Sequence, residues 1–335
     1  MEWQTANASA PGHAGVDQNV FPEAQTVRPQ ERPLFTQIFT LPGGYVDEQG
    51  VTHREVELAP VTGFEEELLD SIGPAACSAH ALTALLSRCL KRIGKLTPVT
   101  AALVRDLLIN DREFLMLKLR ELTLGKNLKA MIVCRDSKCA QSMDIALNLD
   151  DLKPNAKPVD RRVFKFEVNE DGKTFALEFR LPTGADQEAC AGFGADPESA
   201  VNQLLARIVL RVNDNCSVDA QTIEILPSGV LRELERRIEE LEPLLSIDLE
   251  AVCVECGQSL VSHLDLTSFF LDELQQNRRL LEREVHFIAW HYHWPEREIL
   301  SLTRRKRRRY IDLIQSDSTV ALGAGRTIAT LPASS

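Results

Sequence analysis

The alternation of apolar and polar residues predicts a β-hairpin followed by helices near the beginning of the chain. Segments 34–39 and 54–58 alternate as strands do, because successive side chains of a strand point to opposite faces. Apolar residues at helical spacing follow. The helices are expected to begin at Thr62, to cover 80–93, and to restart at a cap formed by Asn110 and Asp111.

The same succession of patterns returns further along the chain. Segments 163–168 and 175–179 flank an Asp-Gly pair, which predicts a second hairpin. A Thr-Gly pair at Thr183 again precedes a helical pattern, and 199–212 is expected to form one helix. Ser228 opens a further helix with leucines and isoleucines on one face. The unit is therefore of the α+β class.

Each succession ends in a pair of closely spaced cysteines. The first pair is Cys134-x4-Cys139 and the second is Cys253-x2-Cys256, which a glycine follows. Both spacings lie within the range that zinc sites tolerate, and a glycine accepts the positive φ that closes such a turn. Two such pairs supply one four-cysteine ligand set, and the sequence therefore predicts a structural Zn²⁺ site. The alternative is two unrelated thiol pairs, or a site whose wider first loop no longer binds metal.

The positions of corresponding features favour a tandem duplication. Helix starts, caps and knuckle cysteines recur at a nearly constant offset of about 120 residues. The predicted organisation is a duplicated hairpin–helices–cysteine-knuckle unit followed by a C-terminal helical extension. Its segments are a disordered arm (1–33), a first repeat (34–153), a second repeat (160–271), a helical docking segment (272–315) and a disordered tail (316–335).

The docking segment carries the remaining candidate functional residues. A helix over 272–293 is expected to break at Trp294 and Pro295, and a short helix then leads to a final one over 304–314. Its aromatic side chains offer large, stiff surfaces of the kind that dominate protein interfaces. The predicted partner-binding residues are Trp290, Tyr292 and Trp294 together with the basic run Arg304, Arg305, Lys306, Arg307, Arg308 and Arg309.

Composition limits the classes of function. The net charge of −11 argues against binding of nucleic acid or anionic lipid by the body of the protein. The basic run is the exception, and it leaves nucleic acid as a possible partner. No apolar stretch has the roughly 20 residues of a membrane span. The N-terminus lacks signal-peptide features, so a cytoplasmic protein with reduced cysteines is expected. No nucleophile motif or phosphate loop appears, and the chain is predicted not to be an enzyme.

Three groups of residues resemble the T4-type baseplate proteins of contractile phage tails and phage-tail-like contractile injection systems. They are the openings Leu58-Ala-Pro-Val-Thr-Gly-Phe-Glu-Glu and Leu181-Pro-Thr-Gly-Ala-Asp-Gln-Glu, the Cys253 knuckle leading to Leu-Asp-Leu, and the stretch from Ile288 through the basic run to Tyr310. The resemblance covers about residues 35–315. It implies a structural or assembly role at the baseplate hub, in the cytoplasm or within the assembled particle, with hub, tube or spike proteins as partners.

Two functional hypotheses follow. The first is a non-enzymatic structural or assembly protein of a contractile tail-like particle, stabilised by zinc. The second is a zinc-ribbon regulator that binds nucleic acid through the basic helix, since a short helix, a turn and a basic helix imitate a helix-turn-helix.

Overall fold

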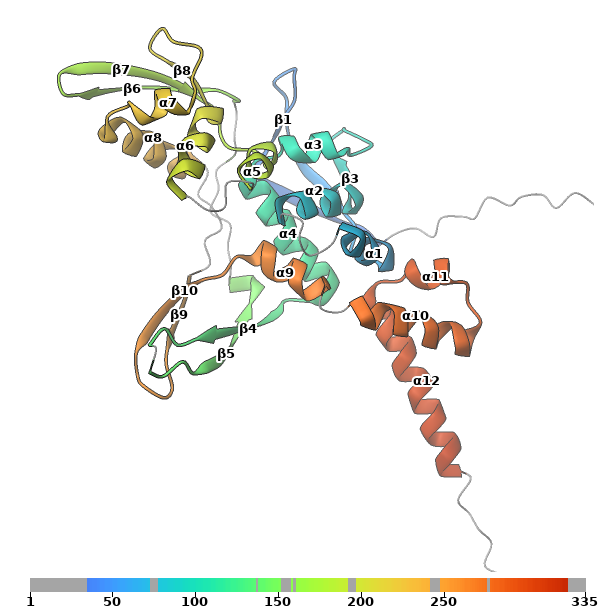
Figure 1. The fold of residues 1–335 in the computed structure, drawn as a ribbon. Helices are drawn as coiled ribbons and strands as arrows, with labels where there is room; N and C mark the ends of the chain where they lie inside the picture. Colours follow the sequence, from blue (N-terminus) through green and yellow to red (C-terminus); the bar gives the residue numbers. More distant parts are fainter. Residues whose placement is uncertain are drawn as a thin grey trace, which may run out of the picture. The chain divides into compact units, whose positions relative to one another are not determined.

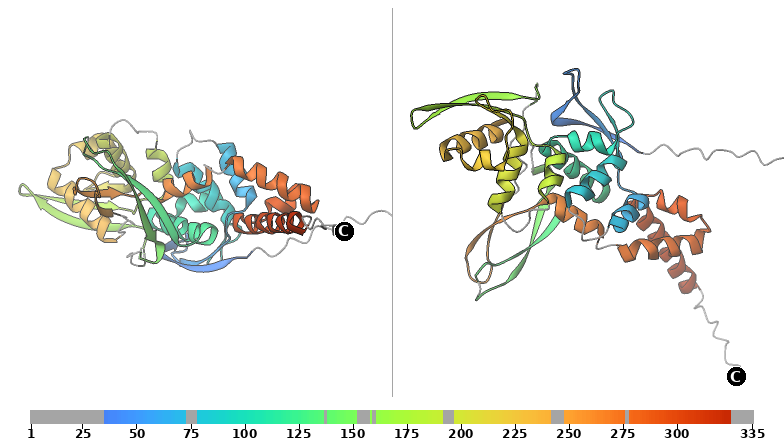
Figure 2. Two further views of the ribbon diagram at one scale, coloured as in Figure 1. Left: turned by 90° about the horizontal axis from the view of Figure 1, so that it is seen from below. Right: turned by 45° about the horizontal axis from the view of Figure 1, so that its top comes forward.

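The computed structural model describes residues 35–72, 78–136, 138–151, 158, 161–191, 197–241, 248–275 and 278–324 (Figures 1 and 2). The predicted disordered arm at 1–33 lies outside these residues, as does the part of the predicted tail from 325 onward. Within the described part of the chain, no helix combines the length and the apolar character needed to cross a membrane.

The elements of the first stretch follow the order strand, strand, helix, helix, strand, helix, helix, strand, strand (Figure 1). They are β1 (Gln37–Val46), β2 (Thr52–Leu58), α1 (Gly63–Ile72), α2 (Ser78–Cys89), β3 (Leu90–Ile93), α3 (Ala101–Asp106), α4 (Ile109–Leu124), β4 (Asn127–Val133) and β5 (Ser142–Asn148), with a 3-10 turn at Leu149–Asp151.

The second stretch repeats this order. Its elements are β6 (Phe164–Glu170), β7 (Lys173–Phe179), α5 (Gly184–Cys190), α6 (Pro197–Ile208), β8 (Val209–Val212), α7 (Ala220–Glu224), α8 (Ser228–Leu241), β9 (Asp248–Val252) and β10 (Ser259–His263). The chain then ends in helices α9 (Leu266–Gln275), α10 (Arg278–Tyr292), α11 (Glu296–Leu300) and α12 (Arg304–Ala324).

The strands form two three-stranded antiparallel sheets and two hairpins. The sheets have the orders β1-β2-β3 and β6-β7-β8, and the hairpins are β4-β5 and β9-β10. Both sheets shift register at the same place, between Glu57 and Leu58 in β2 and between Glu178 and Phe179 in β7. The combination of helices with antiparallel sheets confirms the predicted α+β class.

Three apolar clusters hold these elements together. The first lies among α1, α2, β1–β3, α3 and α4, and it also buries Phe270, Leu271 and Leu274 of α9. The second lies among β6–β8, α6, α7 and α8. The third joins the two hairpins and includes Cys134 and Cys253. The third cluster is therefore built from segments more than a hundred residues apart, and it includes or contacts three of the four candidate metal ligands, Cys134, Cys139 and Cys253.

The structure corrects the sequence predictions at four kinds of feature: the two third strands, the helix over 272–293, the C-terminal tail and one helix cap. Residues 90–93 and 209–212, expected at the ends of helices, are the third strands β3 and β8. The predicted helix over 272–293 is two helices, α9 and α10, of which α9 begins at Leu266. The predicted tail at 316–335 is helical as far as Ala324, since extending an existing helix costs much less than nucleating one.

The fourth correction concerns the cap at Asn110 and Asp111. Helix α4 begins earlier, at Ile109, and Asp111 lies inside it. The buried carboxylate of Asp111 accepts hydrogen bonds from the backbone N–H groups of Gly43 and Gly44, at 2.8 and 2.7 Å. The residue therefore fixes an irregular part of β1 against α4. Because burial outweighs these hydrogen bonds, the pKa of Asp111 is raised to about 6.

Candidate functional site

The β4–β5 hairpin places the first two cysteines. In β4 the alternate residues Leu128, Ala130 and Ile132 are buried, and Cys134 continues that face. The N–H of Cys134 donates to the Gln141 carbonyl at 2.8 Å, so the loop closes as an extension of the hairpin.

The β9–β10 hairpin places the other two in the same way. The N–H of Cys253 donates to the Gln258 carbonyl at 2.9 Å, and that of Gly257 donates to the Cys253 carbonyl at 2.9 Å. Gly257 has a φ of +71°, a conformation that side chains disfavour and glycine accepts. The glycine predicted from the Cys-x2-Cys-Gly pattern therefore has the expected backbone role.

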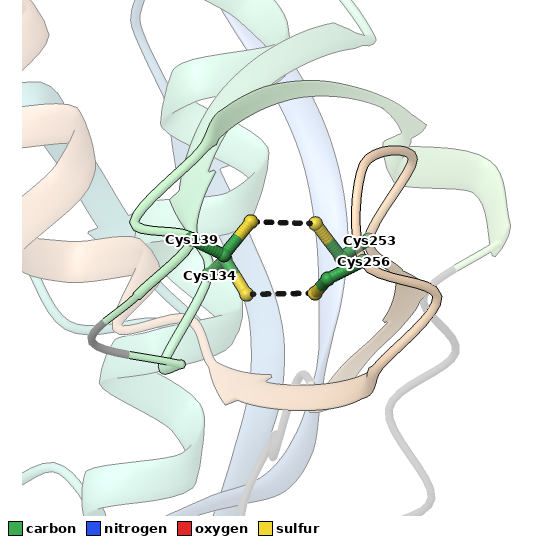
Figure 3. A group of neighbouring side chains, drawn as sticks. All are labelled: Cys134, Cys139, Cys253 and Cys256. Carbon is green, nitrogen blue, oxygen red and sulfur yellow. Dashed lines mark hydrogen bonds between the residues drawn. The ribbon is translucent and has the colours of Figure 1, made fainter.

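The four sulfurs converge on one volume (Figure 3). All four Sγ atoms lie within 4.8 Å of one another. The Cys134–Cys256 and Cys139–Cys253 pairs are 3.6 and 3.7 Å apart, and all four thiols are free. A tetrahedral ion with bonds of about 2.3 Å to sulfur separates its ligands by about 3.8 Å. The spacing therefore fits four ligands around one metal ion and is too long for disulfides.

Backbone N–H groups that donate hydrogen bonds to the sulfur atoms affect the pKa values of the cysteine thiols. Hydrogen bonds from the N–H groups of Cys256 and Glu255 lower the pKa of Cys253 to about 7. A hydrogen bond from the N–H of Gln141 lowers the pKa of Cys139, but burial and the neighbouring thiols outweigh it and raise this pKa to about 12. Four adjacent thiolates repel one another, so a bound cation is what would hold the whole set deprotonated.

A closed set of four sulfur ligands leaves no coordination position for a substrate or water. Such a site stabilises a fold and does not catalyse a reaction at the metal. Here it would tie the β4–β5 hairpin to the β9–β10 hairpin, two segments that the third apolar cluster already brings together.

The predicted aromatic docking residues differ in exposure. Trp290 on α10 is 72 % exposed. Tyr292 and Trp294 are half-buried, and their rings stack on each other and meet the edge or face of Tyr310 on α12, with centroids 5.1 to 5.8 Å apart. Of the three, only Trp290 is therefore a largely open apolar surface.

The basic run divides into buried and exposed cations. Arg304 and Arg307 are buried, at 5 % and 0 % exposed, whereas Arg305, Lys306, Arg308 and Arg309 are exposed. The guanidinium of Arg307 pairs with Glu66 on α1 at 2.8 Å and with Glu284 on α10 at 2.8 Å. The burial of Arg304 and Arg307 argues against the predicted contact of these two residues with a partner.

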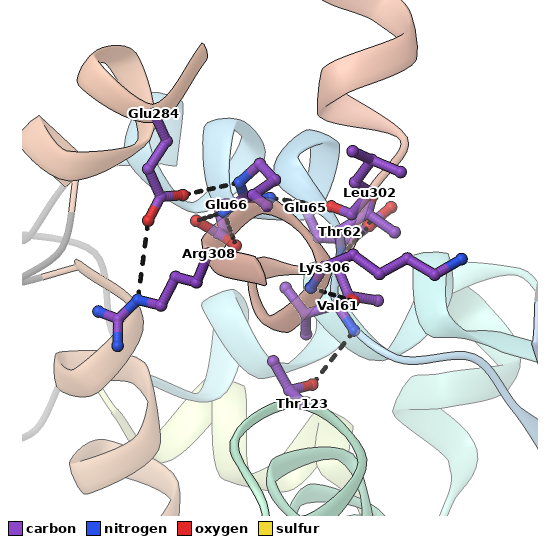
Figure 4. Close-up of polar contacts among 11 residues, drawn as sticks. Val61, Thr62, Glu65, Glu66, Thr123, Glu284, Leu302, Lys306 and Arg308 are labelled. Carbon is purple, nitrogen blue, oxygen red and sulfur yellow. Dashed lines mark hydrogen bonds and ion pairs between the residues drawn. The ribbon is translucent and has the colours of Figure 1, made fainter. Parts of the chain in front are cut away.

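Two Thr-Gly helix starts dock onto equivalent turns elsewhere in the chain. The N–H of Gly184 donates to the Leu107 carbonyl at 3.0 Å, and Thr183 forms a β-bridge with Leu108. The N–H of Gly63 donates to the Leu302 carbonyl at 3.4 Å, and Thr62 forms a β-bridge with Thr303. Figure 4 shows Thr62 beside Leu302. Both starts carry an acid three residues after the threonine, Glu65 or Asp186, which bonds back to the threonine.

The glycine of each pair is required by close packing. A Cβ on Gly63 would lie 2.9 Å from the Leu300 Cα, and a Cβ on Gly184 would lie within the guanidinium of the buried Arg112. Sequence reasoning found the Thr-Gly motif as a helix start but missed its docking role. Its signal was the glycine itself, since glycine is a weak helix former.

The comparisons with known proteins address the same stretch. The search of curated proteins and the search of solved structures gave no match. The family described as T4 bacteriophage base plate protein matches residues 42–271. This match ends before Trp290 and the basic run, so the third group of residues that carries the sequence resemblance, from Ile288 to Tyr310, lies outside it. More than half of the chain is matched, and the chain therefore belongs to the T4 bacteriophage base plate protein family.

Proposed function

We propose that the protein is a non-enzymatic structural or assembly protein of a contractile phage-tail-like particle. Its place of action is the baseplate, at or near the hub, and its partners are hub, tube or spike proteins. The family match over residues 42–271 carries this proposal, because it covers both sheets and both cysteine hairpins. The closed sulfur cluster is consistent with it, since such a site strengthens a building element.

We further propose that residues 34–153 and 160–271 are tandem copies of one unit. The shared strand orders and the matching register shifts support this. So do the hydrogen bonds after the third strand of each sheet: Gly94 donates to the Glu55 carbonyl, and Asn213 donates to the Ala176 carbonyl. Gly94 and Asn213 both adopt a positive φ, which few residue types accept.

The ion proposed for the cluster is Zn²⁺, held by Cys134, Cys139, Cys253 and Cys256. The tetrahedral spacing and the all-sulfur ligand set support zinc, which favours such closed sites. With one ion joining the two hairpins, each copy of the unit supplies half of the ligands. Chelation would then loosen the contact between the hairpins rather than unfold one of them alone.

The test is recovery of the tagged chain from cells that assemble the particle, with identification of the proteins that accompany it. We expect baseplate, hub or tube proteins to be recovered in amounts comparable to the chain. They should no longer be recovered when the tagged chain has been denatured and refolded without metal. The exposed cations Arg305, Lys306, Arg308 and Arg309 favour the second candidate, a nucleic-acid-binding regulator. Sequence-specific binding of duplex DNA at physiological salt, without tail proteins, would decide for that candidate instead.

A further inference from the structure

One short structural element occurs three times among the residues that the structure describes. It is a leucine and the residue after it, here called a Leu–X turn, between a short helix and a longer one. The three are Leu107–Leu108 between α3 and α4, Leu226–Pro227 between α7 and α8, and Leu302–Thr303 between α11 and α12. In sequence the three turns share little beyond the leucine.

Backbone hydrogen bonds make the three turns equivalent. In each, the leucine N–H donates to the carbonyl three residues earlier, and the carbonyl of X accepts from the N–H four residues later. The residues three before the leucine are all fully buried and aliphatic: Val104, Ile223 and Ile299. The three turns therefore present the same backbone surface.

Two of the three turns hold a Thr-Gly helix start, as described above. Leu107–Leu108 holds Thr183 and Gly184, and Leu302–Thr303 holds Thr62 and Gly63. In the first case the N–H of Ile109 also donates to the carbonyl before the threonine, at 3.3 Å. The leucine carbonyl and the N–H after X are thus the groups that bind the docked segment.

In the Leu226–Pro227 turn these two groups hold no docked segment from the described part of the chain, and the carboxylate of Glu170 lies against the neighbouring Gly229. Among the residues that the structure describes, none donates to the Leu226 carbonyl and none accepts from the N–H of Ser228. Ile225, just before the leucine, is 81 % exposed, whereas the other turns have Asp106 and Ser301 there. Within the described chain, the Leu226–Pro227 turn, here called the open turn, therefore lacks the docked segment that binds the equivalent backbone groups of the other two turns.

Proline at the X position leaves docking intact. The occupied turn has Leu108 at φ −59° and ψ 148°, and proline is fixed near the same φ. The N–H of X takes no part in binding the docked segment, so its absence in Pro227 removes no contact. Proline is therefore compatible with the φ that the occupied turn has at this position.

We propose that Ile225–Leu231 is a docking site for the Thr-Gly helix start of a partner protein. Both Thr-Gly starts that this chain uses in docking are engaged within it, so the occupant comes from another chain. Its glycine is required for the same close approach that Gly63 and Gly184 make. The inference rests on contacts within this chain and does not depend on the baseplate assignment.

The open turn also specifies the residue four after the partner's threonine. At the C-terminal turn that residue is Glu66, and it pairs with Arg307, five residues after the leucine. The corresponding residue of the open turn is Leu231, half-buried in the second apolar cluster. A buried acid facing Leu231 would lack a partner, so an apolar residue belongs there. The expected segment reads threonine, glycine, any residue, acid, apolar residue.

The first test uses a synthetic peptide of residues 57–72 with Glu66→Leu, which has this pattern. It is titrated into the full-length protein with isotope-labelled Ile and Leu methyl groups. Binding in the millimolar range is expected, because a free peptide must order its helix. The methyl signals of Ile225, Leu226 and Leu231 shift, and the matched peptide with Gly63→Val as well leaves them unchanged. Shifts confined to the other two turns, or none, would overturn the proposal.

The second test identifies the natural occupant. A photo-crosslinking amino acid replaces Ile225, or as a control the equally exposed Val254, in the full chain made in its own cells. We expect crosslinks from position 225 that map beside a Thr-Gly pair of another protein. The same crosslinks should be absent from position 254. Crosslinks to a second copy of this chain, to a segment without that pair, or from neither position would each contradict it.

Discussion

Replacing Arg307 by alanine is expected to detach the C-terminal helices from the body of the protein. Its guanidinium is fully buried and donates four hydrogen bonds of 2.8 to 2.9 Å: two to Glu66, one to Glu284 and one to the Leu302 carbonyl. The substitution removes the one cation that donates hydrogen bonds to both Glu66 and Glu284, two buried carboxylates that are 8 % and 7 % exposed.

The magnitude follows from that geometry. Removing one partner of a buried ion pair costs about 3–5 kcal/mol, because the charge left behind stays out of water. The neighbouring Arg308 is the matched control: its side chain is 58 % exposed and lies 3.8 Å from Glu284. An exposed pair of this kind contributes about 0–1 kcal/mol. The two alanine variants remove the same chemical group one residue apart, and their effects should differ several-fold.

The assay is urea unfolding followed by circular dichroism, together with limited trypsin digestion of the segment after residue 278. Arg307→Ala should lower the midpoint or speed cleavage of α10–α12, and Arg308→Ala should do neither. A combined Glu66→Leu, Glu284→Leu, Arg307→Leu variant should recover stability, since an apolar set of similar volume can replace a buried ion cluster. Equal behaviour of the two alanine variants in both assays would refute this reasoning.

Three further predictions follow from the same structure. Purified protein should contain about one zinc per chain by elemental analysis, lost in Cys253→Ser but kept in Cys216→Ser, and a metal-free preparation would contradict the site. Between pH 4 and pH 6, stability should fall by up to about 3 kcal/mol as the pH rises, because the pKa of Asp111 is about 6 in the folded state and near 4 when unfolded. Chemical unfolding of Asp111→Asn across this range should lack the slope, and an unchanged slope would assign it to another group. Gly184→Val should lower the unfolding midpoint because a Cβ there overlaps Arg112, and an unchanged midpoint would show that the junction adapts.

Features encoded in neighbouring residues were predicted correctly from the sequence. The two hairpins before the Thr-Gly pairs and the α+β class all follow from alternation, turns and caps. The convergence of the four cysteines was inferred from their spacing, and the structure brings the sulfurs together. That they bind metal stays a prediction, tested by the zinc measurement above.

Features that depend on distant partners were missed. Leu90 and Ile93 are three residues apart, a spacing that fits one face of a helix as well as the two buried ends of a four-residue strand. Pairing with β2 decides between them. Likewise, the run from Arg304 to Arg309 has the composition of a solvent-exposed helix. Glu66, which accepts hydrogen bonds from the buried Arg307, lies 241 residues earlier in the chain. No local pattern signals such a contact.

If this chain builds, or helps to build, a contractile baseplate, particles made without it should lack complete baseplates. The most direct measurement is electron microscopy of the particles from cells in which its gene has been deleted, compared with cells in which the gene has been restored. The account predicts that sheathed particles with complete baseplates are absent after deletion and return on restoration. Normal, complete particles assembled in the absence of the chain would contradict it.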